Sequence, residues 1–330
     1  MQEVLQGPRI LYIASSSRSG STILEHTLGA VEGVFNVGEL RRISDFYNMN
    51  SQAIRDPANS LACTCGAKVV DCTFWREVEK ESGLALGEAK FSSQLDSINR
   101  SLFKIIFFIS GPKITKWFSK IYKPFEKEIA VGENCFKVYS AIKKITKAKY
   151  VVDSSKMIHH FLVLKTVCPE RVSLLALFRD GRAVSKSMIR GERKRYFKKG
   201  NFSNKEDSSI DYTQILRAAI LSWVITTLQI LLFYIRLSKK YRHFIRYEDF
   251  CNEPNSVLVE VLFKFGLTNI ESTTRNPEKY IHTIGGSPSR FSSTFRKIDT
   301  DKRWRKDWNK KDARIFTIYA GLINRMLGYK

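Results

Sequence analysis

The residues that could do chemistry gather in three short polar segments, each following an apolar run: Ser15–Thr22, Asp153–Lys156 and Arg179–Ser187. Each segment combines hydroxyl groups with at least one Arg or Lys. Backbone N–H groups at the start of a helix, joined by a guanidinium or ammonium group, bind anions such as phosphate esters. The first and third segments together predict a ligand with two separated anionic groups.

The first segment, SSSRSGST, differs from the triphosphate-binding loop G-x-x-x-x-G-K-[ST] in two places. Gly20 and Thr22 keep their positions, whereas Ser15 replaces the first glycine and Ser21 replaces the lysine. The cation is instead Arg18, inside the loop. Its bidentate fork suits a phosphate monoester or a phosphosulfate, and the absent lysine argues against triphosphate hydrolysis with Mg²⁺. The alternative is a serine-rich turn that only caps a helix.

The third segment repeats this arrangement of strand, charged turn and helix. Arg179 lies where the apolar run VSLLALF ends, and Ser187 follows eight residues later. A fixed cation and a hydroxyl near a helix start can hold one phosphate. The alternative is a surface pair of Arg179 with Asp180, which would contribute little.

The elements that must position these segments alternate between strands and helices. We expect strands at 9–14, 34–40, 150–153, 172–178 and within HFIRYEDF at 243–250, and helices in most of 76–148. This alternation predicts an α/β fold, a central parallel sheet flanked by helices in a three-layer, P-loop-like arrangement. Ligands of such sheets bind beyond the carboxyl ends of the strands. We expect one domain over residues 1–330, with a helical and loop insertion at about 41–148 and a basic C-terminal segment at about 282–330.

The net charge of +23 favours an anionic partner such as nucleic acid, an acidic polysaccharide, a phosphorylated cofactor or an anionic membrane. Residues 218–235 carry no charge and reach the lower length limit of a membrane span, but a helix buried in a large core has the same composition. We expect the buried helix and no transmembrane segment. No basic and apolar leader precedes the first strand, so we expect a cytoplasmic protein of bacterial type; peripheral membrane association or a truncated Golgi-type enzyme are alternatives.

The ordered set SSSRSGST with Glu39 downstream, FRDGRAVSKS, IRYEDFCNEP and IGGSPSRF followed by DKRWRKDW resembles one family. It is similar to sulfotransferases that use 3′-phosphoadenosine-5′-phosphosulfate (PAPS), in their bacterial, carbohydrate-type and tyrosylprotein-like branch. The resemblance covers most of the chain outside about 76–148. It implies a 5′-phosphosulfate site and a 3′-phosphate site. The residues concerned are Arg18, Ser19, Gly20, Ser21 and Thr22 for the first, Arg179 and Ser187 for the second, and Arg290 as a further phosphate ligand.

Transfer of a sulfuryl group needs a base for the acceptor hydroxyl and a positive charge for the leaving phosphate. Glu39 ends a predicted strand, and the resemblance implies that it is the base; the alternative is a pair with Arg41 or Arg42. Lys156 closes the second polar segment and could neutralise the leaving group, unless it is an ordinary surface lysine. Asp153, Ser154 or Ser155 would cap the next helix, or Asp153 would orient Lys156.

His159 and His160 follow one helical turn later. Some sulfotransferase branches use a histidine base, but not at this place in the chain. We therefore expect both side chains to be structural.

Cys63, Cys65 and Cys72 raise the question of a metal. Three thiols lack an obvious fourth ligand, and C-x-C is not the usual C-x₂-C spacing. The pattern is similar to one in bacterial members of the family, so we expect a structural lid element, with or without a disulfide, and no metal.

The sequence therefore predicts an enzyme that moves a sulfuryl group from PAPS to an acceptor hydroxyl and releases 3′-phosphoadenosine 5′-phosphate (PAP), with no metal required. The acceptor is expected to be a carbohydrate or glycan-like molecule, acidic or sugar-containing, and no nucleic acid is expected. The alternatives are a P-loop kinase that uses ATP and a basic nucleic-acid-binding protein. The sequence does not indicate the oligomeric state.

Overall fold

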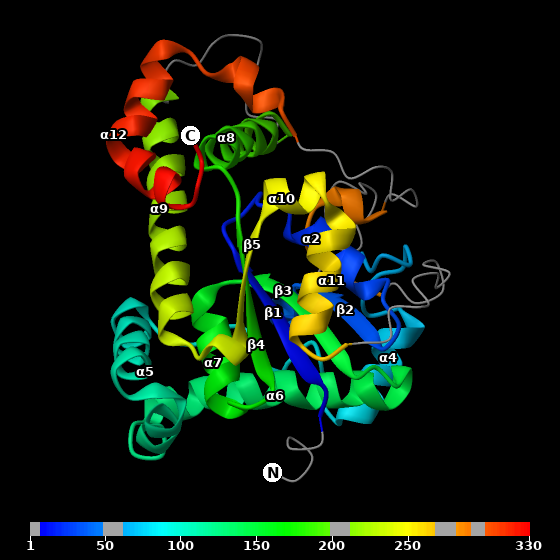
Figure 1. The fold of residues 1–330 in the computed structure, drawn as a ribbon. Helices are drawn as coiled ribbons and strands as arrows, with labels where there is room; N and C mark the ends of the chain where they lie inside the picture. Colours follow the sequence, from blue (N-terminus) through cyan, green and yellow to red (C-terminus); the bar gives the residue numbers. More distant parts are fainter. Residues whose placement is uncertain (1–6, 49–61, 199–211, 268–281, 292–300) are drawn as a thin grey trace.

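The computed structural model describes residues 7–48, 62–198, 212–267, 282–291 and 301–330. Its five strands form one parallel sheet in the order β2-β3-β1-β4-β5. The strands are β1 (Arg9–Ser15), β2 (Val34–Gly38), β3 (Tyr150–Lys156), β4 (Val172–Phe178) and β5 (Arg242–Arg246). The chain leaves β1 toward one side and later returns to the other, so the strand order reverses at β1 (Figure 1). Such a reversal is where parallel sheets bind ligands.

Helices follow the strands and cover both faces of the sheet, so the expected three-layer α/β/α fold is confirmed (Figure 1). The α-helices are α2 (Ser21–Gly29), α3 (Ile43–Tyr47), α4 (Thr73–Ser82), α5 (Ser97–Phe118), α6 (Lys123–Thr146), α7 (Ile158–Val167), α8 (Gly181–Lys198), α9 (Tyr212–Arg236), α10 (Tyr247–Asn252), α11 (Pro254–Lys264) and α12 (Lys310–Met326). Short 3₁₀ helices are η1 (Leu40–Arg42), η3 (Lys239–Tyr241), η5 (Pro288–Phe291) and η6 (Arg303–Asp307).

The alternation of side chains along β1 separates the two cores. Ile10, Tyr12 and Ala14 face the larger core, which α4 to α7 and α9 cover. Leu11 and Ile13 face the smaller core, which α2, α10 and α11 cover. Because every residue of β1 after Arg9 is buried, the strand reads as a continuous apolar run, as expected for a central parallel strand.

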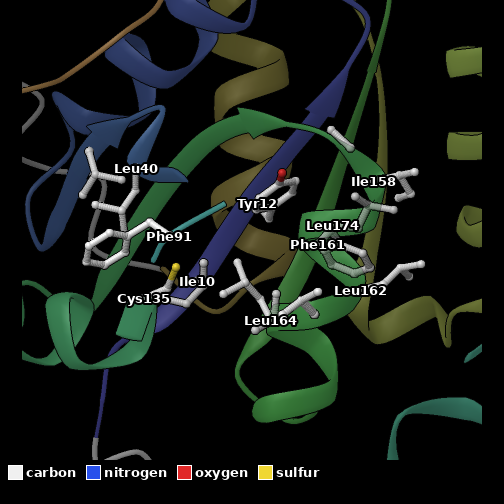
Figure 2. Close-up of a cluster of buried hydrophobic side chains, with 14 of the residues drawn as sticks. Ile10, Tyr12, Leu40, Phe91, Cys135, Ile158, Phe161, Leu162, Leu164 and Leu174 are labelled. Atoms are coloured by element: carbon white, nitrogen blue, oxygen red, sulfur yellow. The ribbon is translucent and has the colours of Figure 1, made fainter. Parts of the chain in front are cut away.

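Figure 2 shows how the larger core holds the strands in place. Tyr12 of β1 lies beside Phe161 of α7, and Ile10, Leu162 and Leu164 are buried in the same core. The Tyr12 ring is tilted against that of Phe161 at 5.7 Å, and its hydroxyl donates to the Met157 carbonyl at 2.8 Å. These contacts anchor the turn between β3 and α7, directly below the end of the sheet that carries the polar segments.

Most of the expected strands are confirmed, with three boundary errors. The strand expected at 34–40 ends at Gly38, and Leu40 begins η1. The prediction for 172–178 matches β4, whereas β3 continues to Lys156, past the expected end at Asp153. In HFIRYEDF the strand stops at Arg246, and Tyr247 begins α10, so a strand over the whole stretch is wrong. The helical prediction for about 76–148 is confirmed by α4, α5 and α6; α5 is kinked at Gly111 and Pro112.

Helix α9 is less buried than the sequence suggests. Among the described residues it is the helix that is long and apolar enough to cross a membrane, and 39% of its most apolar stretch is buried. Trp223 and Ile220 pack into the core, while one row of apolar side chains is exposed: Leu221, Ile225, Leu228, Leu232 and Ile235. The expectation of a helix buried on most sides is therefore wrong for this row.

A segment far along the chain completes the β2 edge of the sheet. Ile284 forms a parallel bridge with Gly38, its amide donates to the Val37 carbonyl, and its carbonyl accepts from the Glu39 amide at 2.7 Å. Gly38 has φ 78°, and a Cβ there would lie 2.0 Å from the Ile284 carbonyl oxygen. Only glycine fits this close approach. The segment 282–287 thus fixes the backbone next to Glu39.

Candidate active site

A cavity of about 620 Å³ lies beyond the carboxyl ends of all five strands. Its lining includes one residue from the end of each strand or from the position directly after it: Ser15, Glu39, Lys156, Arg179 and Tyr247. The three polar segments of the sequence therefore meet at one place. Parallel strands bring their carboxyl ends to one edge, which explains why residues so far apart in sequence converge.

The first polar segment forms a tight loop between β1 and α2 at this cavity. Arg18 has φ 68° and Gly20 has φ 89°, both in the left-handed region. For an arginine this conformation is strained, and such strain concentrates at binding sites. The helix α2 has no side-chain cap, and the Ser16 and Ser19 hydroxyls bond each other at 2.8 Å. The serine-rich turn thus leaves the N-terminus of α2 facing the cavity instead of capping it.

Position 20 requires glycine for two reasons: its left-handed backbone conformation, and the close approach of a neighbouring side chain. A Cβ at this position would lie 2.3 Å from the Tyr247 ring, which also lines the cavity. Further along the helix, the Thr22 hydroxyl accepts the Ser287 amide at 3.1 Å. The loop is therefore held between α10 and the segment that borders β2.

Glu39 and Lys156 form an ion pair at the cavity wall, with the Lys156 ammonium bonded to Oε1 of Glu39. Arg42 reaches Oε2 of Glu39 at 3.9 Å, so the alternative partner from the sequence is also present. Burial alone would raise the pKa of the Glu39 carboxyl, but Lys156, then Arg42 and Arg41, outweigh it and hold that pKa below its ordinary value. Glu39 is thus ionised at neutral pH. Lys156, like Arg18, has a left-handed backbone conformation, with φ 70°.

Arg179 connects the first and third polar segments. Its Nη1 donates to the Arg18 carbonyl at 2.8 Å, and its guanidinium stacks on the Tyr247 ring at 4.4 Å. Nη2 lies 3.6 Å from Asp301 Oδ2, and Nε is buried without a hydrogen-bond partner in the described residues. The side chain is buried and points away from Asp180, which instead pairs with Arg182 at 2.6 Å. The surface pair of Arg179 with Asp180 is therefore wrong.

Ser187 lines the same cavity from the second turn of α8, together with residues that the sequence did not single out. Ser222 and Thr226 reach it from α9, Asp301 from the segment before η6, and Arg303 from the start of η6. Tyr247 was missed because the strand was expected to continue through it, whereas β5 ends at Arg246. Ser222 and Thr226 could not be found, because they interrupt an apolar helix without any local signal.

Two predicted ligands lie elsewhere. Ser19 is buried behind the loop, and among the described lining residues of the cavity neither Ser19 nor Arg290 occurs. The Arg290 guanidinium donates to the carbonyls of Gly285 and Ala62. Burial lowers the pKa of Arg290 to about 10, so it is charged at neutral pH. In this state Arg290 braces two loops.

Asp153 neither caps α7 nor orients Lys156, so both expectations are wrong. Its carboxylate is buried, accepting the Tyr139 hydroxyl at 2.5 Å and the Ser155 amide at 2.7 Å. Helix α7 begins after Met157 without a side-chain cap. The strand simply continues through the polar residues, because the Asp153 carboxylate and the Ser155 hydroxyl accept hydrogen bonds inside the fold.

His159 and His160 are buried in the larger core, away from the lining of the cavity that the structure describes. His159 Nε2 lies 2.8 Å from Glu128 Oε1, and burial lowers the pKa of His160 to about 3. Both side chains therefore pack in the interior, as expected from the sequence.

The three cysteines gain a fourth neighbour that the sequence analysis did not find. His282 lies beside Cys63, Cys65 and Cys72, and their ligand atoms all lie within 4.8 Å of one another. The pattern gave no signal for it because His282 is more than 200 residues away along the chain. No disulfide joins Cys63, Cys65 or Cys72 within the part of the chain that the structure describes.

Solved structures similar to this chain include two sulfotransferase domains. One, the sulfotransferase domain from the curacin biosynthetic pathway, has 15% identity and a TM-score of 0.47, and the match covers 98% of each chain. Another, the sulfotransferase domain from the Synechococcus PCC 7002 olefin synthase, has 17% identity and a TM-score of 0.48, covering 95% of each chain. No family model and no curated protein matches the chain.

Proposed function

We propose that this protein transfers a sulfuryl group from PAPS to an acceptor hydroxyl. The observation that carries the proposal is the meeting of two cation-bearing loops with an ionised Glu–Lys pair in one cavity. The loops at Arg18 and Arg179 supply two anion-binding positions, joined through the Arg18 carbonyl. A donor with a 5′-phosphosulfate and a 3′-phosphate presents two such groups, whereas the lysine that a triphosphate loop uses is replaced by Ser21.

The proposed donor site follows the cavity wall. The uncapped start of α2, with Arg18, Gly20, Ser21 and Thr22, would bind the 5′ end through backbone N–H groups and the guanidinium. Arg179 would bind the 3′-phosphate together with the Ser187 hydroxyl. The unpartnered Nε of Arg179 supports this assignment, since a buried N–H without a partner is costly until a ligand accepts it.

The proposed reaction uses Glu39 and Lys156 in turn. The acceptor oxygen attacks sulfur while Glu39 takes the hydroxyl proton, and the bond from sulfur to the bridging phosphate oxygen breaks. The electron pair stays on that oxygen, and Lys156 neutralises it. Because Lys156 is paired with Glu39 here, its turn toward the donor phosphate would raise the pKa of Glu39 and make the carboxylate a better base.

We further propose a carbohydrate acceptor with acidic groups. Arg303 lines the cavity, and the stretch around it, KRWRK at 302–306, is strongly basic. Trp304 in this stretch lies against Arg182, with the guanidinium 5.1 Å from its ring. Cations beside an aromatic face suit an anionic sugar. Trp304 and Trp308 are both half-buried, and the Trp308 ring packs edge-on against Phe316.

The test combines ligand binding with turnover. PAP should raise the melting temperature of the protein, because a hundredfold excess over its Kd adds about 2.7 kcal/mol to the free energy of unfolding. ATP with Mg²⁺ should raise the melting temperature far less. Labelled sulfate from PAPS should then appear on acidic glycans in preference to neutral sugars, tyrosine peptides or simple alcohols. Equal stabilisation by ATP with Mg²⁺, or no transfer to any hydroxyl, would overturn the proposal in favour of a kinase or a binding protein.

A further inference from the structure

A second cluster of reactive side chains lies outside the cavity, where two loops meet. Cys63 and Cys65 lie on a turn after the β2 edge, Cys72 lies just before α4, and His282 begins the segment that pairs with β2. None of these four residues lines the cavity described above. Nothing in the proposed transfer reaction uses them, so the cluster needs its own explanation.

Four of the six distances within the cluster are close to those of a tetrahedral metal site, and all six are at most 4.8 Å. The Cys65 and Cys72 sulfurs are 3.7 Å apart, and the Cys72 and Cys63 sulfurs are 3.8 Å apart. The Nδ1 atom of His282 lies 3.3 Å from the Cys72 sulfur and 3.6 Å from the Cys63 sulfur. Zn–S bonds of about 2.3 Å and Zn–N bonds of about 2.0 Å at tetrahedral angles place neighbouring sulfurs about 3.8 Å apart and sulfur and nitrogen about 3.5 Å apart.

Backbone N–H groups surround the sulfurs of the cluster. The backbone N–H groups of Cys65, Ala67 and Trp75 face the sulfurs of Cys63, Cys65 and Cys72, respectively. N–H groups directed at sulfur stabilise the negative charge that a thiolate carries. The turn itself is tight, with the Gly66 amide donating to the Cys63 carbonyl at 2.9 Å and Gly66 at φ 89°.

The histidine is also held in place before any metal binds. The Phe74 ring stacks on the His282 ring at 4.7 Å and 12°, and Phe35 of β2 stacks on the other side of this pair, 5.0 Å from Phe74. The amide of the next residue, Thr283, donates to the Thr64 hydroxyl at 2.9 Å. These contacts direct Nδ1 of His282 toward the sulfurs.

We propose that Cys63, Cys65, Cys72 and His282 bind one Zn²⁺ ion as a structural site. Binding releases the thiol protons to solvent and leaves four protein ligands, so no position stays open for a substrate. Soft thiolates with one imidazole at tetrahedral spacing select Zn²⁺ over hard cations. The ion would join the 63–72 loop to the segment 282–287, which pairs with Gly38 and holds the Glu39 amide. This site takes no part in the proposed transfer reaction. It would stabilise the backbone next to Glu39 from outside the cavity.

A disulfide explains the cluster less well. It would pair two of three neighbouring thiols, leave the third alone, and give His282 no role. It would also require an oxidant and a shortening of the sulfur distance to about 2.0 Å. All four side chains have a role only as metal ligands.

The test measures metal on the intact protein. After exhaustive dialysis, elemental analysis should find about one zinc per chain. Replacement of zinc by Co²⁺ should give the intense visible bands of a tetrahedral ion and a thiolate charge-transfer band. Cys65→Ser and His282→Asn should lose both signals. The matched control, Cys168→Ser, replaces a buried cysteine far along the chain and should keep both.

A second measurement covers variants that fail to fold. Thiol modification of the wild-type protein should release zinc stoichiometrically, lower the melting temperature and speed hydrogen exchange at 34–39 and 282–287, but not in α7. Folded protein without bound metal that also fails to take up Co²⁺, or an intact mass two hydrogens lighter with a mapped Cys–Cys link, would overturn the proposal. Retention of zinc and the Co²⁺ spectrum in both ligand variants would overturn it too.

Discussion

The cavity at the strand ends and the cysteine–histidine cluster are built in different ways. Each cavity residue Ser15, Glu39, Lys156, Arg179 and Tyr247 ends a strand or follows one, so the sheet itself sets its place. The cluster instead joins two loops, and its geometry depends on where the segment 282–287 runs. A site on strand ends is positioned by hydrogen bonds of the whole sheet, whereas a site between loops needs its own cross-link. This contrast explains why only the second site calls for a bound ion.

The largest expected effect tests the chemistry of the cavity. Glu39→Gln keeps the shape of the side chain but cannot accept a proton, so kcat should fall about 10²- to 10⁴-fold. Donor affinity should stay the same, because Glu39 is assigned to the acceptor. Single-turnover rates and PAP binding separate the two quantities. Near-normal turnover with normal melting would remove Glu39 from the mechanism.

Lys156→Met should have the next largest effect, because it removes a preorganised charge from the leaving group. The loss of one such donor costs roughly 10²- to 10³-fold in kcat.

The same variant should also change the pH profile. Burial raises the pKa of Glu39, and Lys156 is the main cation that opposes this. Without it the pKa of Glu39 rises. A general base must be ionised, and kcat/KM falls as the pH drops through its pKa, so the acid limb of the variant should lie at higher pH than that of the wild type. An unmoved acid limb would show that another group is the base.

The cavity at the strand ends could be predicted from the sequence to a large extent, whereas the cysteine–histidine cluster could not. The parallel fold and the convergence of Glu39, Lys156 and Arg179 could be predicted, because apolar runs followed by polar turns place those turns at one edge. The partner of the cysteines could not, because no local pattern connects His282 to Cys63. The exposed row on α9 was missed for a related reason: composition gives the length of a helix but not how many neighbours cover it. The end of β3 was misplaced because the Asp153 carboxylate and the Ser155 hydroxyl accept hydrogen bonds inside the fold, from Tyr139 and from the Arg41 amide respectively.

A smaller effect is expected at the third polar segment. Arg179→Ala should weaken donor binding by about 1.5–3 kcal/mol, or roughly 10- to 150-fold in the KM for PAPS. The 3′-phosphate does not change in the reaction, so kcat at saturating donor should change much less. Arg179→Lys keeps the charge but loses the bidentate guanidinium and its stacking on Tyr247. Its KM for PAPS should therefore lie between those of the wild type and Arg179→Ala. A KM for PAPS at the wild-type value would show that Arg179 only supports the loop.

The smallest effect on donor binding is expected at Arg290, which lies between the two regions. Its guanidinium donates to the Ala62 carbonyl beside the cysteine turn and to the Gly285 carbonyl beside Glu39. Arg290→Met leaves these buried carbonyls without a donor, which costs about 1–3 kcal/mol of stability. A brace of this kind predicts a melting temperature lower by a few degrees and a PAP affinity within about threefold of the wild type. The phosphate-ligand role implied by the sequence resemblance predicts the opposite, an unchanged melting temperature and at least a tenfold loss of affinity. Because bound PAP stabilises the folded protein, melting curves without and with PAP measure the stability of the variant and its PAP affinity in one experiment. If the variant melts like the wild type without PAP but is stabilised less by PAP, Arg290 belongs to the donor site. Arg290 would then connect the two regions in function as well as in structure.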